Sequence, residues 1–317
     1  MQIFKKKEKR HYTKEEKIKL MKKMWSQKYL YLMFLLPFTI YFTFQYLPLT
    51  KVPWAFTNLG EVPAYKTSFV GLKHFRDLLG TSAFKRAFVN TLVISFYNLL
   101  TGIPSSVLIA LCLNEITSKW FKKTTQTIIY LPHFFSWAII GGIFYLLLAP
   151  QNSVNAQVSE LLGKEPTYYF ASLDHIRGLL VFTNRWQGAG YGAIVYLAAL
   201  AGVDPGLYEA ATLDGANKFQ KIRHISLPCI RPIITTMFIL SIGGILNVFG
   251  QVVVLCTEIT YAKVDTIDLY AYRTGIQQMK QGYATAVSLF KGVISMFLVW
   301  LTNRIVKKMS DGEEGVF

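Results

Sequence analysis

Six long apolar runs constrain this 317-residue chain more than any other feature of its sequence. A helix needs about 20 consecutive apolar residues to cross the hydrocarbon core of a bilayer. The predicted spans are residues 29–50, 87–113, 125–149, 179–203, 232–256 and 284–305. Because lipid cannot satisfy backbone polar groups, spanning segments are helices or closed barrels. We therefore expect an all-α membrane protein with six transmembrane helices.

The positive charges lie mainly beside these runs. The formal net charge is +16, which alone would also fit a nucleic-acid-binding protein. Much of that charge, however, lies in residues 1–28, directly before the first run, where it fits an anionic lipid surface better. With this segment inside the cell, the inner segments carry about twice as many Lys and Arg residues as the outer segments. The sequence thus predicts cytoplasmic N- and C-termini, contact with membrane lipid and no nucleic acid partner.

The spans also define the expected organisation. The predicted parts are a basic cytoplasmic segment at 1–28, a first transmembrane helix at 29–50, an extracellular loop at 51–86, a five-helix core at 87–305 with a cytoplasmic loop at 204–231, and a cytoplasmic tail at 306–317. The first run is too long for the apolar core of a signal peptide, and no small-residue cleavage site follows it. We expect it to remain as an anchor. The isolated Cys112, Cys229 and Cys256 indicate neither a disulfide framework nor a metal site.

The cytoplasmic loop reads as a polar helical hairpin. Asp204 can cap a short helix whose first position is Pro205, and Gly215 can end that helix with a positive φ. A second helical turn then places apolar residues on one stripe before Leu227-Pro228, which is expected to stop it. A basic amphipathic helix lying at the lipid surface is the alternative. That alternative does not explain the adjacent alanines or the glycine.

This hairpin resembles the EAA loop of permease subunits in bacterial binding-protein-dependent ABC importers. The loop pattern is EAA, three residues, Gly, nine residues, Ile, one residue and Leu-Pro. It falls here on Glu209, Ala210, Ala211, Gly215, Ile225, Leu227 and Pro228, with Asp214 just before the glycine. The resemblance implies that Glu209 supplies polar contacts to an ATPase groove, that the alanines allow a close fit, and that Gly215 makes the bend.

Three flanking stretches narrow the resemblance to LplB-type polysaccharide or oligosaccharide permeases. They are residues 196–205, 266–275 and 283–291. The resemblance implies a type I importer permease of the MetI-like, MalF-like fold in a bacterial cell membrane. It also implies a second homologous permease, a cytoplasmic ATPase dimer, an extracellular solute-binding lipoprotein and a sugar or oligosaccharide substrate. The chain has no G-x-x-x-x-G-K-[ST] motif, so ATP and Mg are expected on the partner ATPase, and the chain itself is expected to be non-catalytic without a cofactor.

Polar residues inside the predicted spans form a candidate substrate path. Charges are rare at membrane depth and tend to mark a pathway or a partner. The candidates are Arg185, Trp186, Gln187, Asn247, Gln251 and Lys291. Arg185 and Lys291 can equally extend to the outer membrane surface, so both interpretations stay open here. The family often has an acidic residue before the glutamine of the fifth span, whereas this chain has Gly250, which weakens any transfer of substrate contacts to Gln251.

Helix-breaking and small residues predict bends and close packing. Pro104 is expected to interrupt the second span, and Pro132 to bend the third near its start. Gly188, Gly190 and Gly192 give the fourth span a surface on which another helix can pack closely.

Two other classes of protein fit less well. An ion-driven secondary transporter would need carboxylates at the membrane midplane or matching broken helices, and no Asp or Glu lies in any predicted span. A membrane enzyme would need a motif such as H-E-x-x-H or G-x-S-x-G, and the chain has none. An ABC permease for a non-sugar solute remains open.

Overall fold

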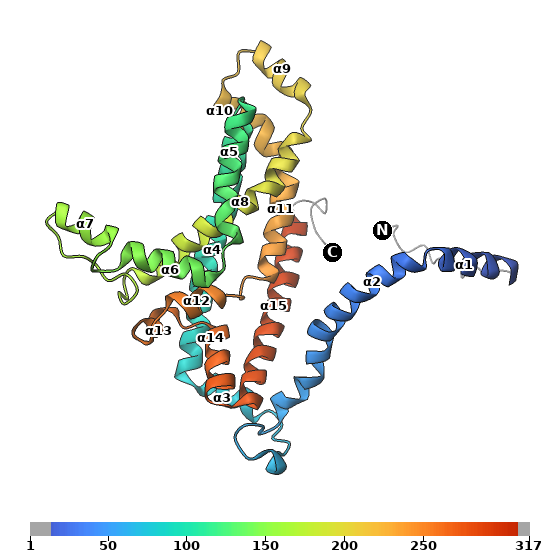
Figure 1. Ribbon diagram of the computed structural model, residues 1–317, viewed down its shortest axis with the longest axis vertical. Coiled ribbons are helices and arrows are strands. Elements are labelled where there is room, and N and C mark those ends of the chain that lie inside the picture. The colour runs from blue at the N-terminus through green and yellow to red at the C-terminus, as the bar shows by residue number, and fades with distance from the viewer. Residues whose placement is uncertain (1–13, 310–317) are drawn as a thin grey trace. The chain divides into compact units, whose positions relative to one another are not determined.

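The computed structural model describes residues 14–309, and the chain divides into two units, Met1–Pro53 and Trp54–Phe317. Helices dominate both units (Figure 1). Within residues 14–309, β-structure is limited to the isolated bridges Thr57–Phe69 and Leu59–Val62. The all-α prediction is confirmed. Residues 1–13 and 310–317, which include parts of the predicted basic segment and tail, lie outside the described residues.

The first unit is almost entirely helical, and the type of helix changes along it. It contains α1 Lys14–Ser26, α2 Lys28–Tyr41, the π-helix η1 Phe42–Tyr46 and the start of the 3-10 helix η2 Leu47–Phe56. Residues Lys28–Phe56 together are long and apolar enough to cross a membrane, close to the predicted span 29–50.

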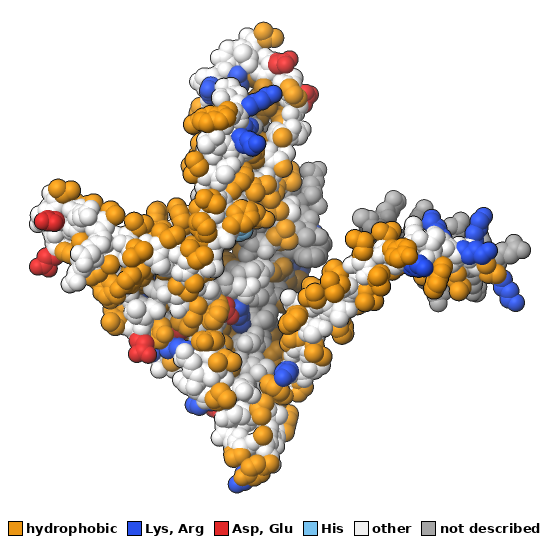
Figure 2. Space-filling model, in the orientation of Figure 1, with side chains coloured by type: hydrophobic (Ala, Val, Ile, Leu, Met, Phe, Trp, Pro, Cys, Tyr) orange, Lys and Arg blue, Asp and Glu red, His pale blue; other side chains and the backbone are white. Residues whose placement is uncertain are grey.

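The second unit is built on long apolar helices. These are α4 Ser82–Asn114, α8 Ile176–Ala201, α15 Gln281–Met309 and the continuous run α10 Lys218–Lys221, η5 Ile222–Ser226 and α11 Leu227–Gly243. α4 packs along α8, and α11 packs along α15 (Figure 1). Hydrophobic side chains cover much of the visible surface, while Lys and Arg gather around α5 and α10 (Figure 2).

Two pairs of helices are sharply bent. α5 Lys119–Tyr130 and η4 Leu131–Phe134 meet α6 Trp137–Leu148 at 105°. A bend was predicted at Pro132, and the break lies just after it, at residues 135–136. α8 meets α9 Pro205–Leu213 at 73°. Within residues 14–309, four helices are long and apolar enough to span a membrane, or up to six if each bent pair is one span.

Shorter elements complete the second unit. They are η3 Ala64–Lys66, α3 Lys73–Gly80, α7 Val154–Leu161, α12 Gly250–Leu255, η6 Glu258–Thr260, α13 Tyr261–Val264, α14 Ile267–Tyr272 and η7 Arg273–Gln277. The segment from Trp54 to Gly71 folds onto the start of α15, since Gly282 N donates to Leu59 O at 2.9 Å. His74 Nε2 lies 2.7 Å from Thr57 O and ties α3 to the same segment.

The predicted fifth span, 232–256, is not one continuous helix. The long helix runs from Lys218 to Gly243, and α12 begins only at Gly250. Two consecutive glycines, Gly243 and Gly244, stand at the break, where low helix propensity favours an end. The helix that contains the first half of the predicted span therefore begins inside the predicted loop 204–231, and residues 244–249 lie between two helices.

Proline had less effect than predicted at two other places. α4 continues through Pro104 as a single helix, and Ser105 Oγ donates to Gly102 O at 2.9 Å beside it. Leu227-Pro228 does not stop the second helical turn of the hairpin, because α11 begins there. Proline is tolerated in the first turn of a helix, where its missing N–H does least harm, and the wide turn of η5 directly precedes it.

Three apolar clusters hold the second unit together. One contains Ile94, Ile140 and Leu180, from α4, α6 and α8. A second joins α3, α4, α14 and α15 around Phe84, and the third joins α4, α8 and α11 around Tyr196. The predicted close packing is confirmed at Gly190 and Gly192, because a Cβ there would overlap Ile129 and Ser106, respectively. It is wrong at Gly188, where a Cβ would meet no atom within 4 Å.

Candidate coupling hairpin and polar cavity

The hairpin around α9 has the local structure that its sequence predicts. Asp204 Oδ1 accepts a hydrogen bond from Gly206 N at 2.9 Å, and Pro205 is the first helical residue. Gly215 has a φ of +78°, as predicted. Ala216 N donates to Ala211 O at 2.9 Å across the end of the helix, which closes the turn.

The second helix of the hairpin, α10, also has a capped N-terminus. Asn217 Oδ1 accepts from Gln220 N at 2.9 Å, and Gln220 Oε1 accepts from Asn217 N at 2.7 Å. This reciprocal pair is a capping box, and it fixes where α10 begins. The N-x-x-Q pattern at residues 217–220 is the sequence signal of this capping box, which was not among the predicted features.

The surface of α9 is exposed within the second unit. Glu209, Ala210 and Asp214 are exposed, and Ala211 is half-buried. Leu213 is 90% exposed. α9 lies at the end of the unit away from α3 (Figure 1). An exposed helix with small residues and an exposed leucine is suited to docking a partner.

The base of the hairpin is joined to the long helices by side chains. Tyr208 Oη and Ser226 Oγ lie 2.9 Å apart, which links α9 to the base of α11. Lys221 Nζ donates to Thr212 Oγ1 at 2.8 Å across the hairpin. Ile225 and Leu227 are half-buried, and Leu227 packs against the third apolar cluster, while Pro228 is exposed. These contacts attach α9 to η5 and the start of α11.

A polar cavity of about 410 Å³ lies between α4, α8, α11 and the break after Gly244. Polar and aromatic residues on its wall are Ser95, Asn98, Ser106, Asn184, Arg185, Tyr191, Tyr196, Ser241 and Asn247, and the rest of the wall is formed by glycines and apolar side chains. Two of the six predicted path residues, Arg185 and Asn247, therefore reach it. Gly102 leaves room for Arg185, since a Cβ there would overlap the guanidinium.

The other predicted path residues have different surroundings. Trp186 packs edge-on against Phe144, with ring centroids 5.4 Å apart. Gln187 Nε2 donates to Phe135 O at 3.2 Å. Gln251 is buried and donates to Thr183 Oγ1 at 2.7 Å and to Leu180 O. These three side chains join helices together and do not line the polar cavity.

Lys291 is paired with a carboxylate. Its Nζ lies 2.5 Å from Asp268 Oδ1, and the two side chains are only 14% and 21% exposed. Asp268 Oδ2 also accepts from Val248 N at 3.2 Å. In the structure, Lys291 therefore does not extend toward the outer surface. The ion pair instead connects α15 and α14 to the non-helical residues 244–249.

The non-helical segment 244–249 is held by further side chains. Thr266 Oγ1 donates to Val248 O at 2.8 Å, and Ser95 Oγ donates to Ile245 O. Exposed backbone polar groups are costly in a membrane unless protein or water satisfies them. These bonds, together with Asp268, allow a long helix to break beside the cavity.

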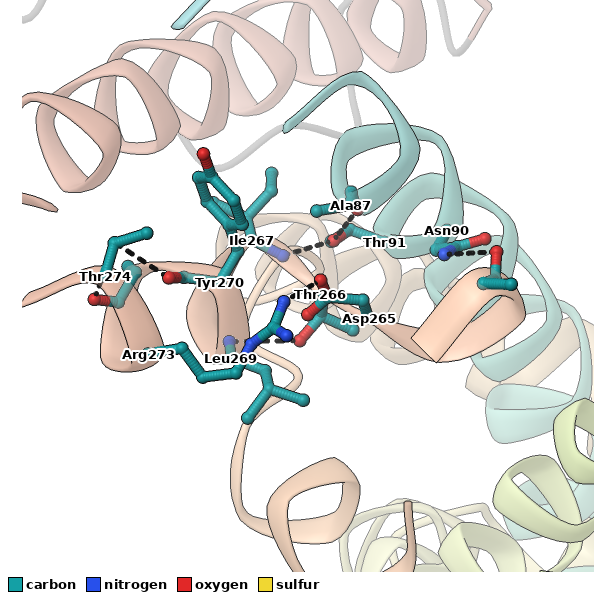
Figure 3. Close-up of polar contacts among 12 residues, drawn as sticks. Ala87, Asn90, Thr91, Asp265, Thr266, Ile267, Leu269, Tyr270, Arg273 and Thr274 are labelled. Carbon is teal, nitrogen blue, oxygen red and sulfur yellow. Dashed lines mark hydrogen bonds and ion pairs between the residues drawn. The ribbon is translucent and has the colours of Figure 1, made fainter. Parts of the chain in front are cut away.

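A second charged network joins α14 and η7 to α4. Figure 3 shows Arg273 facing Asp265, with which it forms an ion pair. Thr91 Oγ1 accepts from Ile267 N at 2.9 Å, which fixes this region on α4. Burial raises the pKa of Asp265 to about 6, although the guanidinium of Arg273 opposes that rise. Asp265 and Arg273 are only 8 positions apart, but the contact that fixes the network on α4 joins residues 176 positions apart, which sequence reasoning could not anticipate.

No metal site is apparent in the part of the chain that the structure describes. Within residues 14–309, no three His, Cys, Asp or Glu residues are grouped so that they could hold an ion. The geometry offers a docking surface and a polar cavity.

Comparison with known proteins identifies the family. Residues 81–311 match the family described as "Binding-protein-dependent transport system inner membrane component". The chain belongs to this family. It is therefore a multi-pass permease subunit of an ABC transporter, and ATP hydrolysis belongs to a separate partner subunit.

Relatives with high coverage support the assignment. The chain is 38% identical to the polygalacturonan/rhamnogalacturonan transport system permease protein YteP of Bacillus subtilis (strain 168), covering 96% of this chain and 95% of that one. It is 37% identical to protein LplB of the same organism, covering 92% and 91%. A crystal structure of a bacterial ABC transporter that imports the acidic polysaccharide alginate matches with a TM-score of 0.82 at 35% identity, covering 92% of this chain and 99% of that one. The predicted resemblance and the type I permease fold are confirmed.

Proposed function

We propose that this protein is one permease of an ATP-driven importer that moves an oligosaccharide into a bacterial cell. The observation that carries the proposal is similarity over nearly the full length to permeases and a solved importer of polysaccharide systems. A related solved structure, with a TM-score of 0.81 and 36% identity, is an alginate transporter in complex with a periplasmic protein bound to alginate pentasaccharide. By analogy, an extracellular solute-binding lipoprotein delivers the sugar to this permease and to a second, homologous permease.

The α9 hairpin is the docking element in this proposal. Glu209 makes polar contacts in a groove of the ATPase, Ala210 and Ala211 allow close approach, and Gly215 sets the bend. The ATP and Mg are held by the ATPase dimer, and this chain needs no cofactor of its own. Asp214, Ile225, Leu227 and Pro228 shape the return of the chain into the membrane. The exposed Leu213 and the capped helix ends support this role.

The working cycle follows from the attachments at the hairpin base. Closure of the ATPase dimer displaces α9, and the Tyr208–Ser226 contact transmits that displacement to α11. α11 ends at the break beside the polar cavity, so its movement changes access to Arg185 and Asn247. This is a rigid-body change between two states that nucleotide binding biases. In the proposed orientation the hairpin and both termini are cytoplasmic.

The proposal is tested by purification and reconstitution. Affinity capture of the solubilised permease, followed by mass spectrometry, is expected to recover a P-loop ATPase, a second permease and a lipoprotein. The complex in liposomes is then expected to take up an oligosaccharide only when ATP is present on the hairpin side. Recovery without an ATPase, or uptake that follows an ion gradient without ATP, would contradict the proposal.

A further inference from the structure

The helix α1 comes directly before the first candidate span but is not part of it. Its 13 residues, Lys14–Ser26, extend about 20 Å at 1.5 Å per residue, which is too short to cross a bilayer. Residues 14–28 contain six Lys and two Glu, whereas the apolar span begins only at Lys28. Figure 1 shows α1 turning away from the direction of α2. α1 is therefore a charged helix attached to the end of a membrane span.

One side of α1 carries large apolar side chains. Ile18, Met21 and Trp25 follow one another at intervals of three and four residues, so they form one stripe along the helix. These side chains are 55%, 69% and 74% exposed, and Met24 beside them is 52% exposed. A continuous exposed stripe of this kind marks a surface that contacts a membrane or a protein partner.

Lysine side chains occupy the other side of α1. Lys19 and Lys23 are one turn apart and face away from the apolar stripe, and Lys22 borders it. All three are exposed. Lys14 lies one turn before Ile18, and its long side chain can reach outward from the stripe. A basic side opposite an apolar side that includes Trp is typical of helices that lie in the plane of an anionic membrane surface.

The junction between α1 and α2 favours lipid over a protein partner. Trp25 and Tyr29 lie on either side of Lys28, whose Nζ is 5.4 Å and 5.3 Å from the two ring centroids. Trp and Tyr are enriched where a span meets the lipid headgroups. Gln27 leaves the helical conformation, with φ −101° and ψ 15°, so the chain can change direction there. Because Trp25 belongs both to this junction and to the stripe of α1, the stripe starts at the level of the headgroups.

We propose that α1 lies flat on the membrane and binds anionic phospholipid. Its lysines contact the phosphate groups, and Ile18, Met21 and Trp25 insert beside the acyl chains. The charge of the lysines is complementary to that of the lipid, and the apolar stripe continues into the apolar span. The inference goes beyond the proposed function, because it concerns a lipid ligand and holds whichever solute is carried.

Spin labels in the complete transporter test the position of α1. After the other cysteines are replaced by alanine, one label is attached at Met21→Cys and a matched label at Ser26→Cys. The two positions lie on different sides of the helix, and neither change alters the charge. In vesicles that contain phosphatidylglycerol, the label at position 21 should collide more with oxygen and less with a water-soluble nickel complex than the label at position 26. In vesicles of phosphatidylcholine alone, this difference should decrease.

Lysine variants test whether charge holds the helix on the lipid. A lysine near an anionic surface contributes roughly a fivefold increase in binding. Replacing Lys19, Lys22 and Lys23 together by Gln should therefore lower the ratio of inserted to free α1 roughly 100-fold, and replacing them by Arg should preserve it. Residues 1–28 keep eight other Lys and Arg, so the orientation of the chain should not change.

Three results would overturn the proposal. The first is equal accessibility of the two labels in phosphatidylglycerol vesicles. The second is insertion of the label at position 21 that is the same in phosphatidylcholine or in the triple Gln variant, since the lipid charge would then have no role. The third is a label at position 21 that is equally shielded in detergent without phospholipid, which would assign the stripe to a protein contact. Each of these results leaves the proposed transport function intact.

Discussion

The buried ion pair between Lys291 and Asp268 predicts that the effect of replacing either side chain on the stability of the protein depends on whether the other is present. Both are largely buried, and their nearest atoms lie 2.5 Å apart. Removing one partner of a buried ion pair leaves an uncompensated charge and costs about 3–5 kcal/mol, whereas replacing both is often close to neutral. We therefore expect Lys291→Met and Asp268→Asn each to destabilise the protein by roughly that amount. The double variant should lie within about 1 kcal/mol of the unmodified protein, because the amide that replaces the carboxylate still offers an oxygen acceptor to Val248 N.

Thermal unfolding of the purified permease complex measures this dependence. At about 2–4 °C per kcal/mol for a chain of 150–250 residues, each single variant should lower the melting temperature by about 10 °C. The double variant should recover most of that loss. If the decreases in melting temperature of the two single variants simply add in the double variant, the two charges do not act as a pair. The ion pair would then not stabilise the non-helical segment 244–249.

Three further predictions concern the hairpin and the Asp265 network. Tyr208→Phe removes the contact with the buried Ser226 and should lower the number of sugar molecules transported per ATP hydrolysed. The control is Tyr65→Phe, at an exposed tyrosine. An unchanged ratio of sugar to ATP in Tyr208→Phe would exclude this contact from coupling. Gly215→Ala should cost about 1–2 kcal/mol of local stability, since its added Cβ would meet no neighbouring atom and only the positive φ is strained. Gly215→Val should reduce substrate-stimulated ATP hydrolysis more than Gly215→Ala does. Equal ATP hydrolysis by the two variants would contradict the strained turn. The pKa of Asp265, raised by burial to about 6, lies above its usual value, so the native state binds this proton more readily and stability should increase as pH falls from 7 to 5. Melting temperatures across that range should show the increase, and Asp265→Asn should remove it.

Local chemistry made much of the hairpin predictable. Asp204, Pro205 and Gly215 each act within a few residues of their own position, so their roles follow from the sequence. The bend at Pro132 was predictable for the same reason. By contrast, Pro104 stays inside an unbroken helix, and the fifth span ends at Gly243 although apolar residues continue to Cys256. Hydropathy cannot separate these cases, because tertiary contacts from Ser95, Thr266 and Asp268 stabilise the break.

The predicted path residues do not share one environment. Arg185 and Asn247 line the polar cavity, but Gln187 and Gln251 form hydrogen bonds between helices. A polar residue in an apolar run indicates that it needs a partner, and the sequence does not say whether that partner is a ligand or another helix. Lys291 shows the same limit, because its partner Asp268 lies 23 positions away, between the predicted fifth and sixth spans.

Crosslinking at the tip of the hairpin tests the central claim most directly. With Cys112, Cys229 and Cys256 replaced by alanine, a single cysteine is placed at Ala210, and a matched single cysteine is placed at Val154 on α7. In vesicles containing the whole transporter, the cysteine at 210 should crosslink to the ATPase, with a yield that changes on adding ATP, while the cysteine at 154 should not. Labelling of the cysteine at 210 from outside intact cells, or its failure to crosslink to the ATPase, would contradict a cytoplasmic coupling hairpin.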